Sequence, residues 1–264
     1  MKISVCGKGG SGKSTVVTLL ANGMRERGYK PLVVDSDESN SGLYQMLGFD
    51  KPPVPLMELV GGKKIVLKQM VSRYSAGESE PEMNVLTQNE ILLQDIPPQH
   101  IVEKDSIRLV GIGKILQSLE GCACPMGVLS REFLKKLHLK EDEVAIVDME
   151  AGIEHFGRGV ETSIDSVLVV VEPSLESITL AEKVKRLASG VGINRIWAVM
   201  NKVNSEDLAS KLTNELAGRG IAIIGSIPYD PEIFEACLDG QPLGKGEAAR
   251  EAGKILDTLF PNEN

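Results

Sequence analysis

The chain has 264 residues and a formal net charge of −8, a length suited to one large α/β domain with a sizeable core. The acidic balance argues against nucleic acid as a main partner, because phosphate binding needs a basic surface. No apolar run approaches the roughly 20 residues of a membrane span, and Met1 leads directly into an apolar strand without a signal peptide. We therefore expect a cytoplasmic protein that does not bind membranes.

Strand and helix patterns alternate along most of the chain. Apolar runs predict strands at 3–6, 31–35, 107–112, 145–149, 167–172, 195–201 and 221–227. Helical patterns occupy 16–27, 43–48, 175–188, 206–217 and 247–259. Since the strands are apolar without alternation, both faces of the sheet should be covered. We predict a doubly wound, mostly parallel α/β sheet in a single domain of residues 1–264, with residues 51–121 as an irregular elaboration.

The loop between the first strand and the first helix carries the most specific motif. It matches G-x-x-x-x-G-K-[ST], a P-loop, with a strand before it and a helix after it. Its glycines let backbone N–H groups turn toward phosphates, and the helix N-terminus adds partial positive charge. Lys13 should reach the β- and γ-phosphates, and the Ser14 hydroxyl should bind Mg²⁺. The predicted nucleotide-binding residues of this loop are Gly7, Lys8, Gly9, Gly10, Ser11, Gly12, Lys13, Ser14 and Thr15.

Carboxylates follow two of the predicted strands. Asp35 and Asp37 end the second strand, at the edge where open α/β sheets bind ligands. We assign Asp37 to orienting water for attack or holding Mg²⁺ through water, although two turn aspartates would also fit. Asp148 ends a buried apolar strand in the Walker-B pattern and should support Mg²⁺. Gly152, shortly after it, is the glycine expected in a switch segment.

Two strand ends suggest walls for a nucleotide base. Asn201 and Lys202 end one strand, and an amide supplies both a donor and an acceptor to a purine edge. Pro228, within Ile227-Pro-Tyr-Asp230, could form the opposite wall. A plain turn would explain either segment as well.

The cysteines fall into two groups. Cys122 and Cys124 are two residues apart, so in an extended segment both thiolates would face one metal ion. Two ligands are too few for a tetrahedral site, but a two-fold dimer would supply four for Zn²⁺, Ni²⁺ or a cluster. Incidental loop cysteines or a strained redox disulfide are the alternatives. Cys6 and Cys237 read as packing residues, and two of the three histidines, His100 and His138, read as surface residues.

These motifs together resemble a known family. The string Gly7–Thr15, with Asp37 and Asp148, resembles the deviant-Walker dimeric ATPases, which include the nitrogenase iron protein, division-site regulators and partition proteins. The Cys-x-Cys pair and the segment 148–159 are most similar to the CooC type, the nickel-insertion accessory ATPases of carbon monoxide dehydrogenase.

The resemblance implies a homodimer that binds ATP, hydrolyses it to ADP with Mg²⁺, and holds Ni²⁺ or Zn²⁺ on four thiolates across the two-fold axis. Lys8 would reach the nucleotide of the other subunit and act with Lys13 and Asp37 in hydrolysis. ATP hydrolysis would release the metal into a client nickel enzyme, carbon monoxide dehydrogenase or acetyl-CoA synthase. The role of His155, in the predicted switch, is left open.

Two other functions share the same P-loop. One is a nucleotide-dependent partition or positioning switch, which the acidic charge and the acidic C-terminal end disfavour. The other is an iron–sulfur electron donor of the iron-protein type. That protein's second cluster cysteine would follow the Walker-B aspartate, and residues 149–152 contain none.

Overall fold

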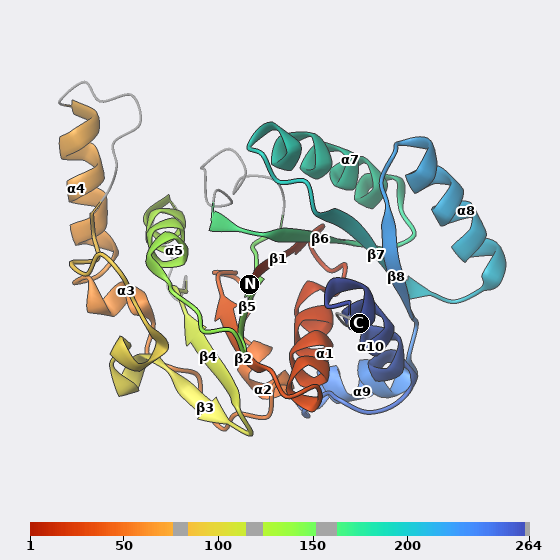
Figure 1. The fold of residues 1–264 in the computed structure, drawn as a ribbon, viewed down its shortest axis with the longest axis horizontal. Helices are drawn as coiled ribbons and strands as arrows, with labels where there is room; N and C mark the ends of the chain where they lie inside the picture. Colours follow the sequence, from red (N-terminus) through yellow and green to blue (C-terminus); the bar gives the residue numbers. More distant parts are fainter. Residues whose placement is uncertain (76–83, 115–123, 152–162, 262–264) are drawn as a thin grey trace.

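A computed structural model describes residues 1–75, 84–114, 124–151 and 163–261 (Figure 1). Its centre is an eight-stranded sheet in the order β3-β4-β2-β5-β1-β6-β7-β8, in which only the β3–β4 pair is antiparallel. The strands are β1 (Lys2–Gly7), β2 (Lys30–Asp35), β3 (Val102–Lys104), β4 (Ile107–Gly111), β5 (Glu143–Asp148), β6 (Ser166–Val171), β7 (Ile196–Val203) and β8 (Ile223–Pro228). The predicted fold class, a mostly parallel α/β sheet, is confirmed.

Helices cover both faces of the sheet and bury two separate apolar clusters (Figure 1). One face packs against α3 (Leu56–Leu59), α4 (Lys63–Ser75), α5 (Cys124–Lys136), α7 (Leu175–Gly190) and α8 (Glu206–Gly218). The other packs against α1 (Lys13–Glu26), α2 (Leu43–Met46), α9 (Pro231–Leu238) and α10 (Glu247–Leu259). Side chains on alternate positions of each central strand enter opposite clusters, which explains the continuous apolar runs.

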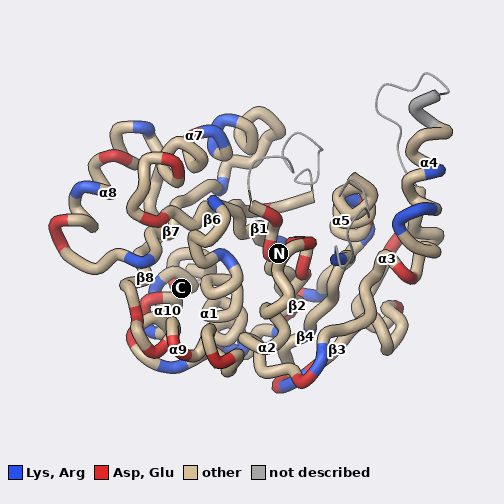
Figure 2. Tube along the Cα trace, turned by 180° about the vertical axis from the view of Figure 1, so that it is seen from behind, with Lys and Arg blue, Asp and Glu red and all other residues tan. Residues whose placement is uncertain are grey.

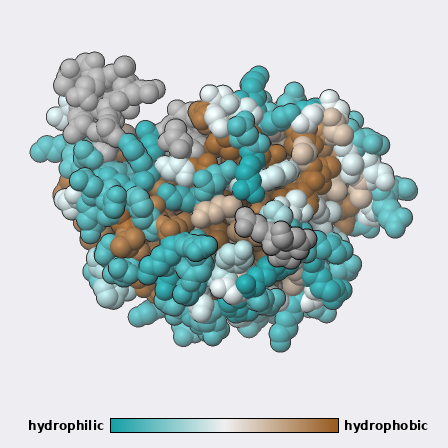
Figure 3. All heavy atoms as spheres, in the orientation of Figure 1, coloured by the Kyte–Doolittle hydropathy of each residue, from teal (hydrophilic) through white to brown (hydrophobic). Residues whose placement is uncertain are grey.

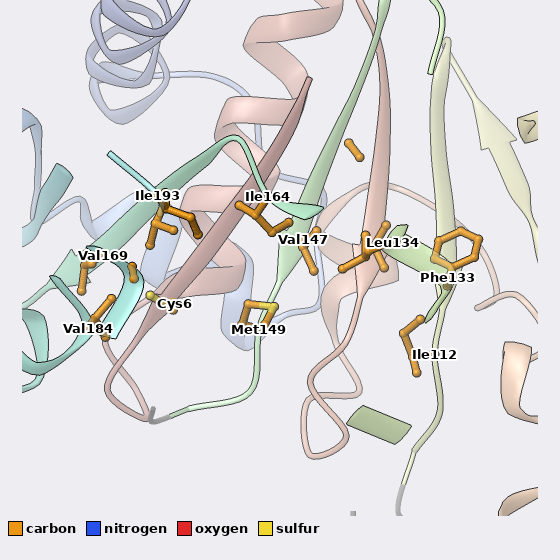
Figure 4. Close-up of a cluster of buried hydrophobic side chains, with 14 of the residues drawn as sticks. Cys6, Ile112, Phe133, Leu134, Val147, Met149, Ile164, Val169, Val184 and Ile193 are labelled. Carbon is orange, nitrogen blue, oxygen red and sulfur yellow. The ribbon is translucent and has the colours of Figure 1, made fainter. Parts of the chain in front are cut away.

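The central strands are buried almost completely. Cys6 on β1 and Val169 on β6 point into the same cluster as Val184 of α7 (Figure 4). Cys6 is 1 % exposed, in keeping with its predicted packing role. This rigid core fixes the carboxyl ends of β1, β2, β5 and β7, from which the candidate site is built.

The irregular segment adds an edge to the domain. Two 3₁₀ turns, η1 (Leu93–Asp95) and η2 (Pro98–His100), precede the short strand β3, which pairs with β4 at the sheet edge. The helix α4 stands at the periphery beside α5 (Figure 1). The prediction that His100 lies on the surface is wrong: it is 4 % exposed, and its Nδ1 lies 2.9 Å from the Val54 carbonyl oxygen. The imidazole of His100 tolerates burial because its Nδ1 has a hydrogen-bond partner in the Val54 carbonyl oxygen.

Candidate functional site

The P-loop connects β1 to α1 in a conformation that requires glycine at two positions. Gly7 has φ 150° and Gly12 has φ 93°. A Cβ at Gly7 would lie 2.6 Å from the Val170 carbonyl oxygen, and one at Gly12 would collide with the Asn201 amide. That amide donates to the Ser11 carbonyl oxygen at 2.7 Å. The strand end of β7 therefore locks the phosphate loop in place.

The two lysines of the loop have different surroundings. Lys13 is 5 % exposed, and its Nζ donates to the Lys8 carbonyl oxygen at 3.5 Å. Lys8 is more open, and its Nζ lies 2.9 Å from a Glu176 oxygen and 3.2 Å from a Glu172 oxygen. These carboxylates raise the pKa of Lys8, Glu176 most strongly. Within one chain, the signature lysine is thus held by Glu172, which lies between β6 and α7, and by Glu176 in the first turn of α7.

The Ser14 hydroxyl lies at the centre of an oxygen-rich cluster. It donates to Asp148 Oδ2 at 2.6 Å and accepts from Asn40 Nδ2 at 2.6 Å. Asp148 is fully buried, and its other oxygen, Oδ1, has no hydrogen-bond partner among the described residues. An unsatisfied buried carboxylate oxygen beside a hydroxyl is a suitable ligand set for a hard cation such as Mg²⁺.

Burial raises the pKa of Asp148 to about 7, against the opposing hydrogen bond from Ser14. Glu38 behaves similarly, because burial and the neighbouring Glu150 carboxyl raise its pKa to about 7. In the nucleotide-free protein, negative charge is therefore poorly tolerated at this edge of the sheet. A bound cation would reverse that penalty.

The loop after β2 separates the two aspartates that the sequence singled out. Asp37 Oδ1 accepts hydrogen bonds from the backbone and the hydroxyl of Ser39, at 2.9 and 2.6 Å. Asp35 instead pairs with Lys114 at 2.8 Å, and burial raises its pKa to about 6. Lys114 also donates to the backbone oxygens of Asp37, at 2.5 Å, and of Asn40. Lys114 thus contacts the loop after β2 at three positions.

Ser14, Asp37 and Asn40 border a cavity of about 450 Å³, whereas Lys8, Asp35, Lys114 and Asp148 do not line it. The predicted base-binding residues Asn201, Lys202 and Pro228 line it together with Gly9, Gly10, Gly12, Lys13, Ser14, Thr15 and Asp37. Lys202 has φ 59°, a strained value for this residue type, and its Nζ donates to the Gly10 carbonyl oxygen at 2.5 Å. The sequence-predicted residues from four strand ends thus meet around one hollow.

Several lining residues were not predicted. Asn40 bridges the loop after β2 to Ser14, and the side chains of α9 supply an apolar wall through Ile233, Phe234 and Cys237. Cys237, expected only to pack, therefore faces the cavity. The sequence could have indicated Asn40, because it lies three residues after Asp37 in the polar run Asp37-Glu-Ser-Asn40. No local sequence pattern indicated Lys114, or Glu172 and Glu176 as the partners of Lys8.

The cysteine pair is only partly visible. Cys124 begins α5, is half-buried and is disulfide-bonded in this structure, as in the disulfide alternative, so metal binding would require its reduction to the thiol. Cys122, Gly152 and His155 lie outside the described residues. Among the residues that are described, no group of three or more His, Cys, Asp or Glu side chains could hold a metal. A metal site of Cys122 and Cys124 therefore stays a prediction.

Within the described ranges, no helix combines the length and apolar character that crossing a membrane requires.

Comparisons with known proteins agree with this geometry. Residues 3–243 match the family described as the CobQ/CobB/MinD/ParA nucleotide binding domain. An uncharacterized ATP-binding protein of Methanocaldococcus jannaschii is 44% identical, covering 92% of this chain and 94% of that protein. The carbon monoxide dehydrogenase accessory protein CooC of Rhodospirillum rubrum is 32% identical, covering 100% of this chain and 99% of that protein.

The fold also matches a solved structure of septum site-determining protein MinD of Pyrococcus horikoshii in complex with Mg-ADP, with a TM-score of 0.69. The identity is 20%, and the match covers 98% of this chain and 96% of that one. At this identity, the likeness concerns the fold alone. Sequence, fold and phosphate loop together place the chain in the CobQ/CobB/MinD/ParA family of nucleotide-binding P-loop proteins.

Proposed function

We propose that the protein is an ATP-dependent metallochaperone, which holds nickel or zinc on a Cys-x-Cys pair and delivers it to carbon monoxide dehydrogenase or acetyl-CoA synthase. The observation that carries the proposal is the end-to-end similarity to a carbon monoxide dehydrogenase accessory protein. The presence of Cys122-Ala-Cys124 in this chain supports it, because cysteine thiolates bind soft and borderline transition metals such as zinc.

Nucleotide binding would use the 450 Å³ cavity. The P-loop backbone and Lys13 would hold the phosphates, with the N-terminus of α1 adding its dipole. Asn201 and Pro228 would flank the base, and the apolar side chains of α9 would cover it. Lys202, tied to the Gly10 carbonyl oxygen, would couple the base wall to the phosphate loop.

Mg²⁺ would be held by Ser14 and Asp148, with Asp37 acting directly or through water. The orphaned Asp148 oxygen and the raised pKa of this carboxyl favour the assignment. When bound, Mg²⁺ neutralises charge on the β- and γ-phosphate oxygens. Asn40 donates to Ser14, so it would orient the hydroxyl that coordinates the ion.

Hydrolysis would depend on positioning and charge stabilisation. Asp37 lies on the loop that lines the cavity, where its carboxylate would orient the attacking water. Lys13 would stabilise charge on the transferred phosphoryl group. Lys8 would act from the other subunit of a homodimer, so dimer formation would first break its contacts with Glu172 and Glu176.

Metal binding would require two copies of the chain. Each contributes Cys122 and Cys124, and four thiolates complete a tetrahedral site on the two-fold axis. The nucleotide state would switch the dimer between a form that holds the metal and a form that releases it, as in other γ-phosphate-dependent switches.

Anaerobic Ni²⁺ titration of the purified protein tests this function. We expect thiolate-to-metal charge-transfer absorption that saturates at about one metal per dimer and that Cys122→Ala or Cys124→Ala abolishes. ATP binding should survive in both variants, because it would use the P-loop cavity, and Cys124, the cysteine of the pair that the structure describes, does not line it. Unchanged metal stoichiometry in both variants would refute the proposal, as would nucleotide-dependent binding to DNA in a protein that binds no nickel.

A further inference from the structure

The helices α3 and α4 carry a group of exposed apolar side chains. Leu59, Ile65, Leu67 and Val71 are 42–57% exposed, and we call them the α3–α4 face. Among the described side chains of α4, only Val66 is buried. Figure 3 shows apolar residues interspersed with hydrophilic ones on the left of the molecule, where Figure 1 places these helices. Clustered exposed apolar side chains of this kind mark interaction sites.

The same helix is basic in an acidic protein. Lys63, Lys64 and Lys68 lie on α4, and no acidic residue occurs between 63 and 75. Figure 2 shows these positive charges on α4, apart from the mixed charges on α7 and α8. Since the whole chain has a net charge of −8, α4 is a local exception. Its natural complement is a surface that combines carboxylates with apolar side chains.

A second cavity opens beside this face. It measures about 760 Å³, larger than the nucleotide cavity, and it lies within the size range of binding pockets. Its walls are mainly apolar, with Pro52, Pro55, Met57, Leu67 and Met126 among the lining residues. Lys63 and Lys64 of α4 line it as well, together with Glu58 of α3. The cavity and the α3–α4 face are therefore continuous through α4.

The inner wall of this cavity leads to the nucleotide site. Asp35, Ser41 and Lys114 line it, whereas Asp37 and Asn40, from the same loop, line the nucleotide cavity. Because Lys114 binds Asp35 and the backbone oxygens of Asp37 and Asn40, a group that displaces Lys114 would move that loop. Asn40 would transmit the shift to Ser14.

The cavity also lies close to the cysteine pair in the chain. Met126, which lines it, is two residues from Cys124 on the first turn of α5. An occupant of this cavity would therefore sit between the loop that lines the nucleotide cavity and the start of the helix that carries one proposed metal ligand.

We propose that the α3–α4 face and its cavity form the docking site for the metal-receiving protein, which inserts an apolar side chain flanked by carboxylates. This inference rests on the proposed function and adds the surface through which delivery takes place. The apolar anchor fills the cavity, and the carboxylates pair with Lys64 and Lys68. Such an anchored contact, with charges at its rim, is the usual anatomy of a specific interface.

Two other occupants fit the observations less well. A helix that lies on a membrane segregates its apolar and basic residues, whereas Ile65 and Leu67 point about 160° apart at 100° per residue, with lysines between them. A second copy whose two-fold axis passes beside α4 would place α4 against its own copy, and two basic helices would repel each other. An acidic protein partner has neither difficulty.

The test measures binding of apo carbon monoxide dehydrogenase and of apo acetyl-CoA synthase, each purified and free of nickel, to the full chain by analytical ultracentrifugation. Leu67→Glu, and separately the pair Lys64→Glu with Lys68→Glu, should weaken binding to one of them at least tenfold. Binding to the wild type should weaken with added salt. Val191→Glu is the control for Leu67, because the two side chains are 43% and 44% exposed, and Lys183→Glu is the control for the lysines.

Nickel stoichiometry, ATP binding and dimer mass are measured in the same samples and should not change. Equal weakening by the α4 variants and the controls, or wild-type protein that binds neither enzyme, would overturn the docking site. Vesicles of phosphatidylglycerol that bind the wild type but not Leu67→Glu would assign the face to a membrane instead. Loss of dimer mass in Leu67→Glu would assign it to a second copy. The proposed function fails separately, if the wild type binds no nickel.

Discussion

The nucleotide cavity and the α3–α4 face differ in how many of their side chains have partners within the chain. Around the cavity, Ser14 contacts Asp148 and Lys8 contacts Glu172, across 134 and 164 residues of sequence. On the α3–α4 face, apolar side chains such as Leu67 and Val71 remain 44% and 57% exposed. Both regions border the loop after β2.

This difference separates two kinds of site. The nucleotide cavity is preorganised by contacts from distant strands, so single substitutions there should damage chemistry or folding. The α3–α4 face lacks such contacts, so substitutions there should be tolerated by the isolated protein and felt only on association. Substitutions around the nucleotide cavity should therefore have effects of widely different size, whereas those on the α3–α4 face should alter binding of the partner alone.

The largest effect is expected from Lys13→Ala. Lys13 is buried in the P-loop, where it would stabilise charge on the transferred phosphoryl group. Its loss should lower the ATPase rate by about 100-fold or more, the scale seen when a charge-stabilising donor is removed. Steady-state phosphate release measures it, with Lys183→Ala on the outer face of α7 as the control. Comparable rates in the two variants would contradict the assignment.

Gly12→Ala should unfold the protein more easily and weaken nucleotide binding. The backbone at Gly12 has a positive φ that alanine adopts only with strain, and the added methyl group would collide with the Asn201 amide. Gly28→Ala is the matched control, because Gly28 has φ 84° and open space around its Cβ position. We expect Gly28→Ala to cost about 1 kcal/mol of unfolding free energy, and Gly12→Ala to cost about 2 kcal/mol more.

Urea denaturation of the nucleotide-free proteins compares the two variants. Equal losses would mean that the Asn201 contact adds nothing to the backbone strain and that the phosphate loop is not locked by β7.

The buried carboxyls predict how stability depends on pH. Because the pKa of Asp148 is raised to about 7, the folded state binds a proton that the unfolded chain does not bind until much lower pH. The nucleotide-free protein should therefore become more stable as pH falls from 8 to 6, by at most about 1.4 kcal/mol per pH unit for each such group. Glu38 and Asp35, raised to about 7 and about 6, act in the same direction.

Denaturation midpoints at pH 6 and pH 8 measure this effect. Asp148→Asn, which cannot ionise, should be stabilised at pH 8 and should show a smaller rise on acidification. If the denaturation midpoint of Asp148→Asn changed between pH 6 and pH 8 as much as that of the wild type, Asp148 would not titrate in this range.

Asn40→Ala should weaken magnesium-dependent nucleotide binding by about fivefold, since one hydrogen bond to the coordinating hydroxyl contributes about 1 kcal/mol. Binding of a fluorescent ATP analogue with and without Mg²⁺ separates this effect from general loss of affinity. Thr258→Ala, which removes a side-chain hydrogen bond on α10 at a residue that does not line the cavity, is the comparison. A loss that is equal without Mg²⁺ would contradict the role of Asn40 in orienting Ser14.

The smallest effect concerns Lys8. If dimerisation draws Lys8 away from Glu176, then Glu176→Gln should raise the ATPase rate at low protein concentration by about twofold, as expected for an exposed ion pair. Glu182 lies on the same helix as Glu176 and makes a similar exposed contact to Arg219, which follows α8. Glu182→Gln should leave the ATPase rate unchanged. A lower rate in Glu176→Gln would mean that this carboxylate supports Lys8 instead of competing for it.

The sequence predicted the parts of the site that depend on local order. The P-loop, Asp148 and Asn201 each lie at a strand end, and a parallel sheet brings those ends to one edge. The contacts of Lys114 and of Glu172 depend on which distant segments meet, so no local pattern indicates them. Cys237 was assigned to packing because its helix was read alone, without the cavity that it borders.

The same reason explains what was missed in the fold. The helix α5 received no prediction, although Leu129, Phe133 and Leu134 have helical spacing. Its first half, residues 125–130, contains a proline and a glycine and is buried on all sides, so the pattern covers only the second half. The edge strand β3 has three residues, too few for a periodic signal. Burial of His100 depends on one tertiary contact to Val54, which its proline-rich surroundings do not reveal.

The central claim is that ATP hydrolysis in the first region drives metal transfer to a client. The most direct measurement follows nickel gained by apo carbon monoxide dehydrogenase and by apo acetyl-CoA synthase from the nickel-loaded protein, with ATP, with ADP and with Lys13→Ala. The account predicts that ATP accelerates transfer to one of them, that ADP does not, and that Lys13→Ala holds nickel but shows no acceleration. Transfer at one rate under all three conditions to both enzymes would contradict it.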